Sequence, residues 1–154
     1  MGRSSQAIEP AEPNLLEITL AAAKRDAQTV LPSGDLRRRL TEGVKIRDLP
    51  TIPDQRGTIT ELFDSRWDFH PDPMVFAYCF TIRPGYVKGW NLHKAHEDRY
   101  VVLQGELEVV YFDPRPGSST YGEVCSIVVT GHRRQIVTVP SWVWHADRNI
   151  GNVD

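Results

Sequence analysis

The sequence predicts a mainly β barrel or sandwich preceded by a short helical extension. From Val44 onward, short runs of β-forming residues alternate with turn residues, a pattern typical of sandwiches and barrels. In one run, Leu107, Val109 and Tyr111 alternate with neighbours of the opposite parity, as in a strand that buries one face. Before Val44, apolar residues recur three and four positions apart, which indicates a helix instead.

Two helices are expected in the N-terminal part of the chain. The first is predicted from Asn14 to about Thr29, because Asn14 and Glu17 have the spacing of a capping box. The second is predicted from Asp35 to Glu42, because the glycine that follows is the usual residue after a helix C-terminus.

The change of pattern divides the chain into an N-terminal extension, residues 1–43, and a barrel domain, residues 44–154. Residues 1–13 are polar and contain two prolines, so disorder is expected there. The strands expected in the barrel domain are Val44–Leu49, Thr58–Phe63, Val75–Ile82, Tyr86–His93, Arg99–Leu103, Leu107–Phe112, Val124–Val129 and Ile136–Val139.

The composition fits one globular domain. The chain has 154 residues, of which 40% are hydrophobic and 25% charged. A net charge of −2 gives no reason to expect a nucleic acid or an anionic membrane as partner. Cys79 and Cys125 lie in apolar stretches without a CxxC motif, so two buried thiols in a cytoplasmic protein are expected. No apolar run has the length of a membrane span or a signal-peptide core.

A spaced motif runs through the centre of the barrel domain: Gly85-x5-Asn91-x-His93-x4-Asp98-x6-Gly105. Side chains two residues apart on a strand share a face, so Asn91 and His93 are predicted to point into the barrel together. Gly105 allows a tight turn to the next strand.

A second motif, Pro140-x4-His145-x3-Asn149, is expected to bring another histidine to the same cavity. The two motifs together resemble those of cupins, which are double-stranded β-helix (jelly-roll) barrels. In this chain, an asparagine stands where cupins usually have the first histidine of the first motif. Trp142 stands where they usually have the glycine of the second motif.

Further segments narrow the resemblance to the dTDP-4-dehydrorhamnose 3,5-epimerase family, over residues 44–154. The matching segments are Asp54-Gln-Arg56-Gly57-Thr-Ile-Thr-Glu61, Val87-Lys88-Gly89-Trp90, Asp113-Pro-Arg115 with Ser118-Ser-Thr120-Tyr-Gly122, and Pro140 to Asn149.

This resemblance implies a dTDP-linked 4-keto-6-deoxy sugar as substrate and no metal or other cofactor. In the family, a histidine supported by an aspartate removes a proton beside the ketone, and a tyrosine acts as acid. Arginines hold the diphosphate, since a planar guanidinium binds phosphate through two hydrogen bonds. The resemblance also implies a homodimer that pairs through sheet edges.

The family's base falls on Asn91, whose amide cannot accept the proton. Losing a general base typically costs ~10²–10⁴-fold in rate, so the protein is expected to bind nucleotide and to have lost activity, unless His93 or His145 has become the base. The catalytic positions under consideration are Asn91, His93 and His145.

Four residues are candidates for binding the substrate. Arg56 lies beside a glycine turn and is expected to reach a phosphate, and Glu61 to orient the sugar or a neighbour. Lys88 keeps the charge of the family's arginine but not its two-pronged geometry. Trp142 is expected to stack on a base or a sugar.

Two alternatives to an epimerase remain open. The first is a metal-dependent enzyme that uses His93, Asp98 and His145, because imidazole and carboxylate suit Fe, Mn, Ni or Zn. For Asp98, an ion pair with an arginine is an equally good interpretation. His96 is interpreted as a solvated turn residue. The second alternative is a binding or structural module without chemistry.

Overall fold

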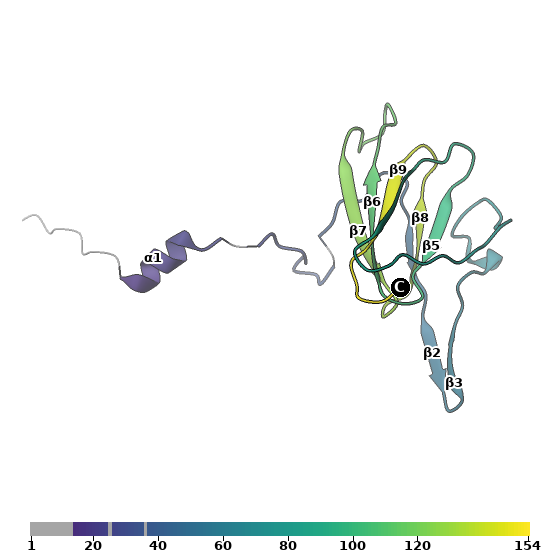
Figure 1. Cartoon of the computed structure of the whole chain (residues 1–154), viewed down its shortest axis with the longest axis horizontal. Helices are drawn as coiled ribbons and strands as arrows, with labels where there is room; N and C mark the ends of the chain where they lie inside the picture. Colours follow the sequence, from purple (N-terminus) through teal and green to yellow (C-terminus); the bar gives the residue numbers. More distant parts are fainter. Residues whose placement is uncertain (1–13, 25, 36) are drawn as a thin grey trace, which may run out of the picture. The chain divides into compact units, whose positions relative to one another are not determined.

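A computed structural model describes residues 14–24, 26–35 and 37–154 (Figure 1). The chain forms two compact units, residues 1–38 and residues 39–154. Among the described residues, no helix combines the length and the hydropathy needed to cross a membrane.

In the first unit, helix α1 covers Leu15–Ala22 and begins with the predicted capping box. Asn14 Oδ1 accepts from the Glu17 amide at 3.1 Å, and Glu17 Oε2 accepts from the Asn14 amide at 2.9 Å. The helix ends at Ala22 instead of continuing to about Thr29. None of its residues is buried, so packing adds little to a short helix that is marginal in water.

The predicted second helix is wrong, because residues 37–42 form no helix. Leu40 packs against the core of the second unit. The Glu42 amide donates to Thr120 Oγ1 at 3.0 Å, and Glu42 Oε2 accepts from the Ser119 amide at 2.8 Å. These tertiary contacts outweigh the weak local preference for a helix.

The second unit is a cupin-type jelly roll of antiparallel strands, which confirms the predicted fold class. Figure 1 shows β6, β7 and β9 on one side and β5 with β8 on the other. The larger sheet has the order β4 (Val87–Asn91), β9 (Trp144–Asn149), β6 (Glu106–Phe112) and β7 (Val124–Thr130). The smaller sheet has the order β1 (Ile46–Asp48), β8 (Gln135–Val139) and β5 (Asp98–Val101). A separate hairpin is formed by β2 (Thr51–Asp54) and β3 (Gly57–Thr60), and a 3₁₀ turn, η1, covers Ser65–Trp67.

The core lies between the two sheets. Val109 and Tyr111 of β6 are buried there, as their alternation predicts, together with Val137 and Val139 of β8. Burying one such aliphatic side chain contributes about 1.5–3 kcal/mol, so these facing strands hold the barrel together.

The segment Val75–Ile82 is not a strand in the structure, contrary to prediction. It has no ladder partner within the described residues, although Ile82 is buried. The expectation of a buried Cys79 is also wrong, because this thiol is exposed with its segment, and Cys125 is half-buried. Strand-forming residues produce a ladder only where a neighbouring strand is available to pair with them.

The Asp113 segment builds a structural loop at the end of β6. The Asp113 side chain is 0% exposed and accepts from Arg115 Nε at 2.8 Å. It also accepts from Ser118 Oγ at 2.6 Å and Thr120 Oγ1 at 2.7 Å. The hydrogen bonds from Arg115, with those of the two hydroxyls, outweigh burial and hold the pKa of Asp113 far below its usual range.

Candidate functional site

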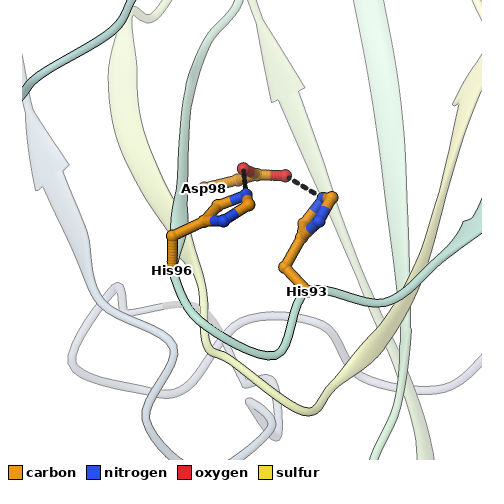
Figure 2. A group of neighbouring side chains, drawn as sticks. All are labelled: His93, His96 and Asp98. Atoms are coloured by element: carbon orange, nitrogen blue, oxygen red, sulfur yellow. Dashed lines mark ion pairs between the residues drawn. The ribbon is translucent and has the colours of Figure 1, made fainter.

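Three histidines converge on the carboxylate of Asp98. Asp98 Oδ2 lies 3.0 Å from His93 Nε2 and 3.5 Å from His145 Nε2. Asp98 Oδ1 lies 3.6 Å from His96 Nε2. Figure 2 shows His93 and His96 facing the two oxygens of Asp98. Tyr100 completes the set by donating its hydroxyl hydrogen to Asp98 Oδ2 at 3.2 Å.

Pairing of the strands explains why residues so far apart in sequence meet. β9 carries His145 and pairs with β4, whose continuation carries His93. Gly89 allows this pairing, because a Cβ there would lie 2.8 Å from the Ala146 Cα. The Trp142 amide donates to the His93 carbonyl at 2.8 Å and ties the two loops together.

The proton position on His145 follows from its surroundings. Its side chain is 0% exposed, and Nδ1 lies 3.3 Å from the Val143 carbonyl oxygen. A carbonyl only accepts, so Nδ1 carries the hydrogen and Nε2 faces Asp98. Burial opposes the charged form, but the interactions with Asp98 and Val143 outweigh it and raise the pKa of His145.

The Asp98 carboxylate is held in its ionised form. Burial acts to raise its pKa, but His145, His93 and Tyr100 together outweigh burial and lower the pKa below its usual value. The site therefore combines a negative carboxylate with several imidazoles, which can carry protons or bind a cation.

A second buried carboxylate, Asp147, lies on β9 two residues after His145. Burial raises the pKa of Asp147 to about 6, against the opposing effects of His145, Tyr100 and Lys88. Asp147 and Tyr100 were missed by sequence reasoning. The alternation of strands could have found them, since each stands two residues after a predicted site residue.

Asn91 does not share the half-buried position of His93. Asn91 lies directly opposite His145 of β9, just after a register shift between Gly89 and Asn91, so these two residues share a face of the sheet. Asn91 is exposed, whereas His93 is half-buried beside Asp98. His96, which the sequence indicated to be a solvated turn residue, is brought into the cluster although its side chain is largely exposed.

The structure divides the predicted substrate-binding residues into two groups. Lys88 lies on β4 with Nζ 4.9 Å from the Phe80 ring centroid, and Trp142 lies on the loop bonded to His93. Arg56 and Glu61 belong to the β2–β3 hairpin and the residue after it, and Figure 1 shows this hairpin projecting away from the two sheets. Arg56 is 89% exposed and pairs with Asp54 at 2.6 Å, so it is not brought to His93 within this chain.

An apolar cavity of about 500 Å³ adjoins the site on the side of Tyr100. It is lined by residues of the segment 77–82 and of β5, among them Tyr78 and Phe80. The ring of Phe80 lies 6.2 Å from that of Tyr100, which in turn contacts Asp98.

Comparison with known proteins gives a consistent result. The family model described as dTDP-4-dehydrorhamnose 3,5-epimerase matches residues 39–147. A probable low-salt glycan biosynthesis epimerase, Agl13 of Haloferax volcanii, is 36% identical over 111 residues, which cover 71% of this chain and 70% of that protein. The spore coat polysaccharide biosynthesis protein SpsL of Bacillus subtilis is 26% identical and covers 73% of this chain and 74% of its own length.

Among solved structures, the epimerase RmlC of Legionella pneumophila in complex with dTDP-4-keto-L-rhamnose has a TM-score of 0.65 at 22% identity. The match covers 74% of this chain and 64% of that one, so this chain spans less than two thirds of its length. At this identity, the likeness establishes the shared jelly-roll fold.

Proposed function

Because this chain belongs to the dTDP-4-dehydrorhamnose 3,5-epimerase family, we propose that it acts on a nucleotide-linked 4-keto-6-deoxy sugar and that His93 is its general base. The observation that supports His93 is its Nε2, 3.0 Å from Asp98 Oδ2. An Nε2–H that donates to Asp98 leaves the lone pair of Nδ1 free to accept a proton.

The chemistry follows from the ketone of such a sugar, which acidifies the neighbouring C–H bonds. His93 Nδ1 takes a proton from a carbon beside the ketone, and the electron pair of the broken C–H bond forms the enolate. The negative Asp98 stabilises the imidazolium that results, and Tyr100 and His145 hold Asp98 in place. Return of a proton to the same carbon restores the ketone.

Asn91 takes no part in this proton transfer. It is exposed, and its amide has no basic nitrogen that could accept the proton. The experiment that tests the proposal is deuterium incorporation from heavy water into a dTDP-4-keto-6-deoxy sugar. This readout detects proton removal without requiring net epimerisation.

Lys88 is proposed to bind the diphosphate, and Trp142 to stack on the sugar or the base. Replacing Lys88 by methionine is expected to raise the Kd for dTDP by about 10–150-fold, because one charged hydrogen bond is worth about 1.5–3 kcal/mol. Isothermal titration with dTDP measures the change. Lys45→Met is the matched control, because it removes the same charge from an exposed position before β1. Equal affinities of the two variants would show that Lys88 does not contact the phosphates.

We also propose that two copies of the chain pair through the segment 75–82. Val75, Phe76 and Tyr78 are 89%, 76% and 71% exposed, and the segment has no ladder partner among the described residues. An exposed apolar segment that has no ladder partner is a template for pairing with another chain.

Phe76→Lys is therefore expected to shift the protein from dimer to monomer at micromolar concentration, since a charge placed in a pairing edge opposes association. Sedimentation velocity measures the mass. Tyr86→Lys is the control, because Tyr86 has a comparable exposure of 66% but lies outside the segment. A dimer that survives Phe76→Lys but not Tyr86→Lys would place the interface elsewhere.

A further inference from the structure

A buried histidine, His70, joins the loop of residues 68–74 to the start of β5. Its side chain is only 6% exposed. His70 Nε2 lies 2.5 Å from Glu97 Oε2, and His70 Nδ1 lies 2.6 Å from Arg99 Nη2. The imidazole therefore bonds both residues that flank Asp98 in the sequence.

The partners of His70 fix the position of its ring hydrogen. The Asp72 amide and the Arg99 guanidinium can only donate, so His70 Nδ1 carries no hydrogen and accepts from both, at 3.1 and 2.6 Å. Nε2 then carries the hydrogen and donates it to the Glu97 carboxylate. Arg99 Nη2 also donates to the Asp72 carbonyl at 2.7 Å, which ties β5 to the loop a second time. Both nitrogens of this buried ring are thus used to hold two segments of the chain together.

Strand alternation relates these contacts to the candidate site. Glu97 and Arg99 are two residues apart and bond His70 on one face, whereas Asp98 between them points to the other face, toward His93. One edge of β5 pairs with β8, and its other edge has no ladder partner in the described part of the chain. Side-chain contacts are therefore needed to fix the start of β5, and with it the Asp98 carboxylate.

The loop that carries His70 is itself held at a second point. Arg47 of β1 places its guanidinium carbon 4.6 Å from the ring centroid of Trp67 in η1, which precedes this loop. β1 and β5 are the two outer strands of the smaller sheet. The chain from Trp67 to His70 is thus attached to both of them, so His70 is a fixed support for β5 and does not simply follow its movements.

We propose that His70 is a positioning residue for Asp98 and, through Asp98, for the general base His93. The inference rests on the function proposed above. Asp98 Oδ2 lies 3.0 Å from His93 Nε2, and this contact keeps the hydrogen of His93 on Nε2 and the lone pair on Nδ1. Without His70, Glu97 and Arg99 lose their common partner, and Asp98 is no longer held at this distance. His93 then carries its hydrogen on either nitrogen, so only a fraction of the molecules has the base in the form that accepts a proton from the sugar.

The first measurement needs no substrate. NMR of the full chain labelled with ¹⁵N, at about pH 8 and thus above the ordinary pKa of histidine, shows which ring nitrogen of His93 carries the hydrogen. We expect the Nε2–H form in the unaltered protein and a mixture of both forms in His70→Phe, which keeps a ring of similar size but makes no hydrogen bonds. His132→Phe is the matched control, because His132 is exposed and lies outside both clusters. Unchanged His93 signals in folded His70→Phe would overturn the proposal.

A second pair of variants covers the case in which His70→Phe does not fold. Glu97→Gln keeps an oxygen that accepts from His70 Nε2, whereas Glu97→Ala removes it. We therefore expect Glu97→Gln to keep the His93 signals of the unaltered protein and Glu97→Ala to show the mixture. Thermal melting establishes that each variant is folded. A loop that is merely structural would lower the melting temperature in Glu97→Ala without changing the His93 signals, and that result would contradict the proposal.

Deuterium exchange into the sugar, measured separately, distinguishes this proposal from the proposed function. His70→Phe is expected to lower kcat by about 10–10²-fold with little change in KM, since a small misplacement of a catalytic group can cost that much. This result together with altered His93 signals supports both. Altered His93 signals without exchange by the unaltered protein support the role of His70 and contradict the function. Exchange by the unaltered protein, with unchanged His93 signals and kcat in His70→Phe, contradicts the role of His70 and supports the function.

Discussion

Replacing His93 with glutamine is expected to lower the rate of deuterium incorporation into a dTDP-4-keto-6-deoxy sugar by about 10²–10⁴-fold, the usual cost of losing a general base. Glutamine keeps a polar side chain of similar reach beside Asp98 but has no basic nitrogen. The effect should appear in kcat with little change in KM, because the base acts on the reacting carbon and holds no other part of the substrate.

Asn91→Ala is the control for this experiment. Its side chain is exposed and stands at the position of the family's base, so the comparison asks which of the two positions carries the proton. We expect Asn91→Ala to retain exchange within a factor of about three, far less than the effect of removing a base. If Asn91→Ala instead lost more exchange activity than His93→Gln, residue 91 and not His93 would be the catalytic position.

Replacing Asp113 with asparagine is expected to lower the free energy of unfolding by about 3 kcal/mol, at the lower end of the values for breaking a buried ion pair. Arg115, Ser118 and Thr120 all donate hydrogen bonds to the Asp113 carboxylate. The NH2 group of asparagine is itself a donor, so it cannot accept the bonds made to the oxygen that it replaces. Urea unfolding followed by circular dichroism measures the change. Asp68→Asn is the control, because it alters an exposed carboxylate that forms no ion pair among the described residues, and it should change the unfolding curve little.

Asp113 should also make the stability of the folded protein depend on pH. The pKa of Asp113 is depressed in the folded state, so its contribution to stability is complete above its unfolded value, about 4. The contribution is lost as the pH falls from there toward the folded value. The free energy of unfolding of the unaltered protein should therefore fall below about pH 4. The difference in this free energy between the unaltered protein and Asp113→Asn should shrink over the same range. A difference that stays constant down to pH 2 would mean that the charge of Asp113 is not what stabilises the loop.

Much of the fold could be predicted because strand alternation is local information. β6 buries Val109 and Tyr111 as their spacing indicates. Two predictions from local pattern were wrong: the strand over residues 75–82 and the second helix. A ladder requires a partner strand, and the conformation of residues 37–42 is set by contacts with Ser119 and Thr120, far away in sequence.

Part of the side-chain cluster could be predicted from the spacing of the two motifs. His93, Asp98 and His145 meet as their two motifs indicated. The exposure of Asn91 could not be predicted, because alternation indicates the face of the sheet on which a residue lies but not what covers that face. His96 was missed because its position in a turn suggested solvent, whereas the turn folds back and places its ring 4.3 Å from that of His93.

The most direct test of the central claim is deuterium exchange by the unaltered protein. The protein is incubated with a dTDP-4-keto-6-deoxy sugar in heavy water, and NMR follows loss of the proton signals beside the ketone. The account predicts incorporation at least about 10²-fold faster than in His93→Gln under identical conditions. Binding of the sugar nucleotide without any enzyme-dependent incorporation would contradict it, and would identify the protein as a binding module that has lost the family's chemistry.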